Sequence, residues 1–148
     1  MKNTFLLFVI LVGLLFTQLS AKKATSSSRS ISLRFGNVRN NHGYLYIYLY
    51  QNAKQYPFHP YKHFKVSKKN VANKSLRFTI DCISKGMYAI TAIDDENGNK
   101  DLDRFWGVPT EGYAFSNNPK TWNIPSYKRL IFGVYKQKNY KYIKMQYV

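Results

Sequence analysis

The sequence is short of three residue types that often define a protein class: cysteine, histidine and acidic residues. Cys82 is the only cysteine, which excludes an internal disulfide, and its apolar strand-like surroundings predict a small buried thiol. His59 and His63 are four residues apart, but Pro60 between them argues against a helical metal pair. His42 is the remaining histidine, and no Ser/His/Asp or Cys/His signature is present. We therefore predict no catalytic residues.

The scarcity of acidic residues is uneven along the chain. Seven acids face 23 lysines and arginines, for a formal net charge of +16, yet six of the seven lie within residues 94–111. Like charges this close repel one another, so they need solvent, the hydrogen bonds of a turn or a bound cation. The six are Asp94, Asp95, Glu96, Asp101, Asp103 and Glu111.

The first 21 residues have the pattern of a secretory signal peptide. Lys2 gives a positive start, an apolar run follows over 5–16, and Ala21 precedes the expected cleavage site. The run is short for a membrane span, although an uncleaved anchor is the alternative. We expect an exported chain, periplasmic or extracellular, with no transmembrane helix after cleavage. Residues 22–30 predict a flexible lead-in and residues 31–148 a single domain.

After the lead-in, apolar residues alternate with a period of two. The alternation is clear over 31–35 and 44–50, with a hairpin-type connection expected at 40–43. Further strands are expected at 64–66, 76–80, 87–93, 130–135 and 140–147, and a long loop at 94–127. With no credible helix, about seven strands predict an all-β, antiparallel β-sandwich.

Aromatic residues are abundant, with 13 tyrosines and 10 phenylalanines. Both residue types favour pleated sheets, so the simplest interpretation is that the tyrosines cover a sheet and point their hydroxyls at water. A platform on which a ligand stacks is the alternative.

Within the acidic stretch, the spacing favours a calcium ion. Alternate Asp and Asn side chains can converge as a tight loop curls round a hard cation that binds oxygen. The candidate ligands are Asp95, Asn97, Asn99, Asp101 and Asp103. Against an EF-hand, Lys100 occupies the position of the turn glycine and Trp106 that of the bidentate glutamate. Two alternatives need no metal: a solvated turn, and a clamp in which the acids dock onto the protein's own basic surface.

The same stretch resembles a known family. The segments 95–99, 102–103 and 107–118 are similar to motifs of the bacterial exported family called domain of unknown function 2141. Residues 86–90, 125–127 and 38–43 resemble its strand entry, its Pro-Ser-aromatic segment and its first hairpin. The likeness covers about residues 31–147. In four places the chain departs from the pattern: at Asp94, at Lys100, between Asp103 and Gly107, where it is one residue shorter, and at 128–129.

The resemblance implies an exported β-sandwich, similar to transthyretin-like or immunoglobulin-like modules, and it implies no activity. Within its motif, five residues are expected to support the long loop: Glu111, Gly112, Phe115, Asn117 and Asn118.

Three functions follow from these features. The first is an exported, non-catalytic binding or structural module with a calcium-binding loop. The second is a basic surface that binds anionic glycans or envelope lipids, for which nucleic acid is a less suitable partner because the chain is exported. The third, and least supported, is a hydrolase that uses the acidic loop.

Overall fold

The computed structural model describes residues 28–121 and 123–148. The predicted signal peptide and most of the predicted lead-in lie outside the described residues. The first strand begins at Arg29, two residues before the alternation that starts at Ile31. In chain order the elements are β1 (Arg29–Gly36), β2 (Tyr44–Tyr50), β3 (Lys62–Ser67), η1 (Lys68–Asn70), β4 (Ser75–Ile83), β5 (Gly86–Asp95), β6 (Arg104–Phe105), β7 (Val108–Pro109), β8 (Gly112–Phe115), α2 (Tyr127–Leu130), β9 (Phe132–Val134) and β10 (Lys138–Lys144).

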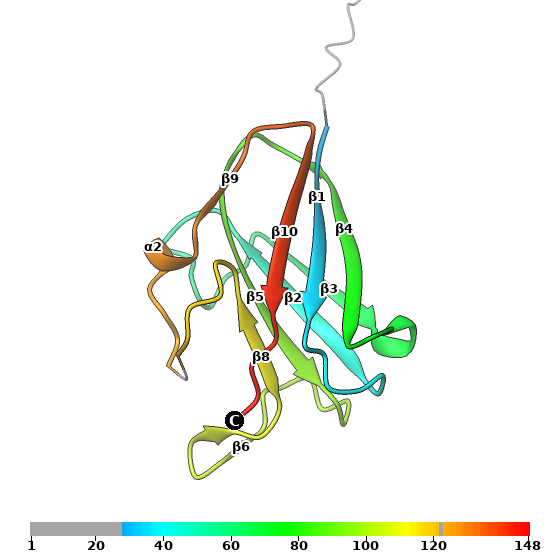
Figure 1. The fold of residues 1–148 in the computed structure, drawn as a ribbon. Helices are drawn as coiled ribbons and strands as arrows, with labels where there is room; N and C mark the ends of the chain where they lie inside the picture. The colour runs from blue at the N-terminus through cyan, green and yellow to red at the C-terminus, as the bar shows by residue number, and fades with distance from the viewer. Residues whose placement is uncertain (1–27, 122) are drawn as a thin grey trace, which may run out of the picture.

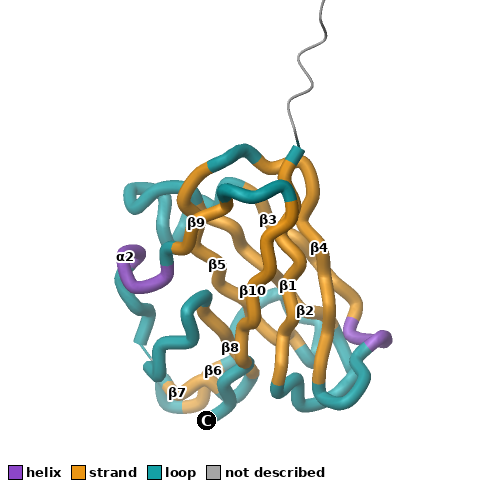
Figure 2. The backbone as a smooth tube through the Cα atoms, turned by 45° about the horizontal axis from the view of Figure 1, so that its top comes forward, coloured by secondary structure: helices purple, strands orange, loops and turns teal. Residues whose placement is uncertain are grey.

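The strands form an all-β sandwich (Figure 1). One sheet has the order β10-β1-β4, and the other has the order β3-β2-β5-β8, with β9 pairing the first residues of β5. A two-stranded hairpin of β6 and β7 projects from one end. Helical structure in the described residues is confined to two short segments, which are purple in Figure 2.

Period-two alternation explains the core, because every second residue of a strand faces the opposite sheet. The inward residues of β1 and β2 belong to one buried cluster, together with residues of β4, β5, β8 and β10. The β1 and β2 members are Ile31, Leu33, Phe35, Leu45, Ile47 and Leu49. Strands predicted from alternation at 31–35, 44–50, 76–80 and 87–93 are therefore present; the second has the expected bounds and the other three are longer.

The predicted pairing between neighbouring strands is wrong at residues 40–43. These residues do not join a hairpin, because β1 pairs β4 and β10 whereas β2 pairs β3 and β5. They belong to a connection, residues 37–43, that carries the chain from one sheet to the other, and Val38 in this connection is fully buried. The closing strands also differ from expectation: β9 and β10 belong to different sheets, and β10 runs parallel to β1.

The expectation of a buried thiol is also wrong, since Cys82 is exposed. The register moves from Ile31↔Ile80 to Arg29↔Ile83, so β4 has one residue more than β1 over this interval. Cys82 takes a left-handed φ of 56° at this β-bulge, and the bulge resets the inward–outward alternation.

Candidate functional site

Two adjacent aspartates end strand β5, and they organise different regions. Asp94 and Asp95 are both fully buried, although carboxylates are seldom buried without partners. Successive side chains of a strand point to opposite faces, so the two carboxylates meet different surroundings. Asp94 contacts charged groups of the sandwich, whereas Asp95 contacts the backbone of the loop that follows.

The surroundings of Asp94 form what we call the ion cluster: Arg39, Lys68, Asp94, Glu96 and Tyr147. The Lys68 Nζ is fully buried and donates to Asp94 Oδ1, as well as to Asn40 Oδ1 at 2.8 Å. The Tyr147 hydroxyl donates to Asp94 Oδ2 at 2.6 Å. Both oxygens of Asp94 thus have a strong donor, which is what makes a buried carboxylate tolerable.

Arg39 closes the outer side of the ion cluster. Its Nε and Nη2 donate to the two carboxylate oxygens of Glu96, at 3.0 and 2.9 Å, in a bidentate pair. Its guanidinium also lies 4.7 Å from the ring centroid of Tyr147. Asp94 and Glu96 therefore dock onto the protein's own cations, as the metal-free clamp hypothesis expects for the acidic stretch.

Burial and pairing shift the pKa values in this cluster. Burial raises the pKa of the Asp94 carboxyl, and the hydrogen bonds from Lys68 and Tyr147 offset only part of that rise. Burial and the bond to Asp94 raise the pKa of the Tyr147 hydroxyl. Burial acts to raise the pKa of Glu96 as well, but its hydrogen bond and attraction to Arg39 lead to a net lowering.

The acidic loop, residues 95–103, is held by bonds from side chains to backbone. Asp95 accepts the backbone N–H of Gly98 at 2.7 Å and that of Lys100 at 3.0 Å. Asn97 Oδ1 accepts the N–H of Asn99, and Asn99 Oδ1 accepts the N–H of Asp101. These Asx-type turns curl the chain through neutral backbone N–H donors, so the loop keeps its shape without ion pairs between its side chains.

Asp103 is the point on which the predicted ligands converge. Its Oδ2 accepts from the amide of Asn97 at 2.5 Å, and its Oδ1 from the amide of Asn99 at 2.7 Å. Asp101 points elsewhere, since its Oδ1 accepts the N–H of Leu102 at 2.7 Å. The structure thus brings together the side chains at 97, 99 and 103, with Asp95 beneath the turn and Asp101 at its edge.

Glu111 ties the two ends of the acidic loop together. It is 5% exposed and accepts the backbone N–H of Glu96 at 2.9 Å and, more weakly, that of Asp103 at 3.3 Å. The Thr110 N–H donates to the Asp103 carbonyl at 2.8 Å, so the hairpin of β6 and β7 closes against the same point. Glu111 is therefore an anchor of the loop.

The other residues expected to support the loop are placed in different ways. Gly112 lies so close to Tyr147 that a side chain would collide with its ring, and Phe115 is buried on β8. Asn117 donates to the carbonyls of residues 129 and 131, and Asn118 bonds to β10 at residues 142 and 144. The two asparagines hold the segment after β8 and do not contact the acidic loop.

The loop tolerates both departures from the EF-hand pattern. Lys100 adopts a φ of 71°, the left-handed conformation that glycine usually supplies, at a cost of about 1 kcal/mol. Its N–H still reaches Asp95. Trp106 is 90% exposed at the tip of the β6–β7 hairpin, where its ring packs edge-on against Phe105.

The donor set fits a hard cation in part. Among the described residues, no group of three or more His, Cys, Asp and Glu side chains is arranged to hold a metal ion. Amide oxygens would have to complete the shell, and Asn97 and Asn99 now turn their nitrogens toward Asp103. However, apart from Glu96, which pairs with Arg39, the carboxylates of the loop and that of Glu111 have no Lys, Arg or His within 4.0 Å in the described part of the chain. Their charge is therefore uncompensated.

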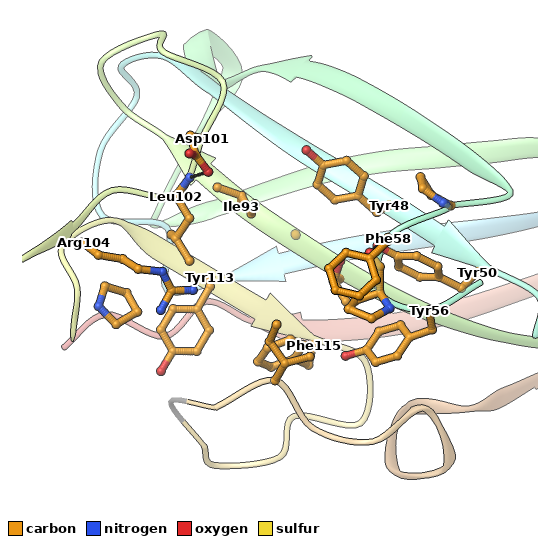
Figure 3. Close-up of a pocket in the computed structure, with 16 residues that line it drawn as sticks. Tyr48, Tyr50, Tyr56, Phe58, Ile93, Asp101, Leu102, Arg104, Tyr113 and Phe115 are labelled. Carbon is orange, nitrogen blue, oxygen red and sulfur yellow. Dashed lines mark hydrogen bonds between the residues drawn. The ribbon is translucent and has the colours of Figure 1, made fainter. Parts of the chain in front are cut away.

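An aromatic cavity of about 410 Å³ lies beside the acidic loop (Figure 3). Its floor is the outer face of β2, β5 and β8, and the turn at 56–60 and Ile124 cover it. In Figure 3, Tyr50, Tyr56 and Phe58 gather at one end, and Leu102, Arg104 and Tyr113 lie at the other. Six aromatic side chains line it: Tyr48, Tyr50, Tyr56, Phe58, Tyr113 and Phe115.

Few polar groups face this cavity. The Tyr50 hydroxyl donates to the Pro57 carbonyl at 2.8 Å, whereas the buried Tyr56 hydroxyl has no partner among the described residues. Burial raises the pKa of Tyr56 to about 12, so it stays neutral at ordinary pH. Asp101 and Arg104 are the charged lining residues, and both are exposed. A mostly apolar cavity with a few polar groups is typical of a small-molecule site.

The partners of Asp94 are not apparent from the sequence alone. Lys68 belongs to a Lys-Lys-Asn segment that suggests a solvated turn, and Tyr147 is one of many alternating tyrosines. The signal available was indirect, namely an acid directly after an apolar strand, where alternation places Asp94 on the same face as Ala92 and Ile90.

Comparison with known proteins identifies a family and no closer relative. The sequence model of the family described as "Uncharacterized protein conserved in bacteria (DUF2141)" matches residues 33–142. No curated protein and no solved structure matches the chain. Within the part of the chain that the structure describes, no helix has the length and apolar character needed to span a bilayer. The chain therefore belongs to the bacterial family of domain of unknown function 2141.

Proposed function

We propose that this chain is an exported, non-catalytic binding module in which a calcium-bound acidic loop forms one wall of the aromatic cavity. The observation that carries the proposal is the shared boundary: Asp101, Leu102 and Arg104 belong to the loop or its edge and also line the cavity. Ordering the loop with an ion would fix the position of that wall. Export rests on the signal-like pattern of residues 1–21.

Charge supports the calcium part of this proposal. In a chain of net charge +16, the carboxylates of Asp95, Asp101 and Asp103 have no cationic partner among the described residues. They have neutral N–H donors instead, which leave lone pairs for a cation. Turning the Asn97 and Asn99 amides would add two neutral oxygens, giving the mixed carboxylate–amide set that calcium accepts.

The cavity supports a ligand that carries a ring. Edge-on packing of Tyr50 against Tyr56, with centroids 5.0 Å apart, leaves aromatic surface facing the hollow. The Arg104 guanidinium has one long hydrogen bond, 3.4 Å to the Gly107 carbonyl, and can pair with an acidic or hydroxyl group of a ligand. Asp101 is the one carboxylate among the described lining residues, whereas glycoside hydrolysis uses two. Binding is therefore better supported than catalysis.

Thermal unfolding with calcium tests the metal part. Extracellular calcium modules bind with a Kd of about 10⁻⁴–10⁻³ M, so about 10 mM calcium should stabilise the fold by about 1.4–2.7 kcal/mol. Asp103→Asn should lose most of this gain. Asp81→Asn is the matched control, because Asp81 is exposed and lies outside the loop, and it should keep the gain. An equal response in both variants, or no response in the unmodified protein, would contradict the proposal.

A fluorescent probe tests the cavity. We expect 8-anilinonaphthalene-1-sulfonate, a ring compound with one anionic group, to bind in the hollow and to bind more tightly when calcium is present. Thr91→Trp places a large side chain on the cavity floor and should abolish binding. Ser84→Trp, at an exposed turn, is the control and should not. Equal probe binding in the two variants would refute the cavity as the site.

A further inference from the structure

The outer face of the β10-β1-β4 sheet is polar and basic, unlike the mostly apolar lining of the cavity. Register and alternation place outward residues of the three strands side by side: Arg34 lies between Arg77 and Tyr142, and Ser32 lies between Thr79 and Tyr140. These side chains line a shallow hollow of about 530 Å³. We call this surface the basic face, defined by Ser32, Arg34, Arg77, Thr79, Tyr140 and Tyr142.

Two arginines lie directly opposite each other at its centre. Arg34 and Arg77 are register partners in an antiparallel pair, where side chains are about 5 Å apart at Cβ. Like charges in this position destabilise a sheet. Arg34 Nε donates to Ser75 Oγ at 3.1 Å, but no carboxylate lies within 4.0 Å of either guanidinium in the described residues. An anion that bridges the two would relieve this repulsion.

The surroundings of the pair are also basic. Lys144 is the register partner of Gly36 and Lys138 that of Ser30, so both follow the outward alternation of β10. Asp81 is the nearest acid on β4, four residues beyond Arg77, or about 13 Å along the strand. The basic face therefore has further positive charges beside it on β10, and the acid of β4 lies outside it.

Aromatic rings lie beside the charges. Tyr140 is 79% exposed and Tyr142 49% exposed, and they are two residues apart on β10, which spaces them by about 6.6 Å. The Arg34 guanidinium lies 6.0 Å from the Tyr142 ring centroid. Flat rings next to guanidinium groups suit a chain of sugar rings that bear acidic groups, because the apolar faces of sugars pack on aromatic rings while the acidic groups meet arginine.

We propose that the basic face binds an anionic polysaccharide, with Arg34 and Arg77 holding its acidic groups and Tyr140 and Tyr142 packing against its sugar rings. A lipid surface suits this face less well, since of the three most exposed large apolar side chains, Phe58, Trp106 and Tyr140, only Tyr140 belongs to it. The proposal rests on charge and register in the β10-β1-β4 sheet and is independent of calcium and the cavity.

The test measures binding of a heparin-derived octasaccharide by the full folded chain. Replacing both arginines, Arg34→Ala with Arg77→Ala, should weaken binding by about tenfold or more, because two charge-assisted hydrogen-bonding groups are lost. Arg34→Lys with Arg77→Lys keeps the net charge and should still weaken binding, by about threefold, because the bidentate geometry is lost. Tyr140→Ala should also weaken binding of the octasaccharide by about threefold, because the ring is lost. Tyr140→Phe keeps the ring and should leave the affinity unchanged.

The control is Lys128→Ala with Arg129→Ala on α2, which removes the same amount of positive charge as the double arginine variant. It should change the affinity by less than about twofold. Equal losses in the control and the β-sheet double variant would overturn the proposal, since the attraction would then be non-specific. Tighter binding to a polyglutamate, a single-stranded oligonucleotide or anionic phospholipid vesicles than to the octasaccharide would also overturn it. Unchanged melting temperatures identify the variants that remain folded; if the alanine pair unfolds, the lysine pair and Tyr140→Ala decide the outcome.

Discussion

The ion cluster and the acidic loop begin at neighbouring residues, yet they treat their carboxylates differently. In the ion cluster, Asp94 meets Lys68 and Glu96 meets Arg39, so each negative charge has a cation of the same chain. In the acidic loop, Asp95 and Asp103 meet neutral N–H donors. The first region is complete without any ligand. The second keeps net negative charge in a basic protein, and this is why we propose that a cation binds in the loop.

The largest expected effect comes from breaking the ion cluster. Lys68→Met leaves the fully buried Asp94 carboxylate without its cation and should lower the free energy of unfolding by about 3–5 kcal/mol, as measured by urea denaturation. Calcium should not rescue the variant. Lys69→Met, at the exposed neighbouring position, should change stability by less than about 0.5 kcal/mol. Equal effects at the two positions would show that the ion cluster does not stabilise the fold.

A smaller effect is expected where the acidic loop is anchored. Glu111→Ala removes the acceptor of the Glu96 and Asp103 N–H groups and should cost about 1–3 kcal/mol. It should also weaken the thermal response to calcium, since Asp103 loses its position. A variant that is destabilised but keeps the full calcium response would separate the anchor from the metal site.

The Arg39–Glu96 pair should make the free energy of unfolding depend on pH, and this effect is smaller still. Arg39 lowers the pKa of Glu96, so the pair contributes stability above the ordinary glutamate pKa and loses it as the pH falls through the lowered value. Both side chains are partly exposed, at 45% and 21%, so the contribution is under about 1 kcal/mol. Arg39→Gln should therefore lower stability at pH 7, and its difference from the unmodified protein should shrink as the pH falls through the lowered pKa of Glu96. A difference that grows on acidification would have the wrong sign.

The smallest effect is expected at the hairpin tip. Trp106→Ser should change the free energy of unfolding by less than about 0.5 kcal/mol, because the side chain is 90% exposed. It should leave the calcium response intact, which would show that the position of the EF-hand glutamate has no role here. Loss of the response would mean that this part of the hairpin reaches the ion.

The strands and the position of the acidic loop could be predicted from the sequence. The pairing of the strands and the side chains that contact the acids could not. Alternation determines which residues of β1 and β2 face inward, but it carries no information on pairing, so residues 40–43 were expected to form a hairpin. The extra residue of the β-bulge near Cys82 changes which residues of β4 face the core, and no Gly or Pro in the sequence signals that bulge. The Asp/Asn spacing predicted a curled loop. Lys68, the partner of Asp94, comes from a distant segment and is brought there by tertiary packing alone.

The most direct test of the central claim is a crystal structure of the protein grown with calcium. We expect one ion per chain in the acidic loop, with oxygen ligands from Asp95, Asp103 and the turned Asn97 and Asn99 amides at about 2.3–2.6 Å. The Lys68–Asp94 contact should be unchanged. An acidic loop without an ion at saturating calcium, with both amides still bonded to Asp103, would contradict the account.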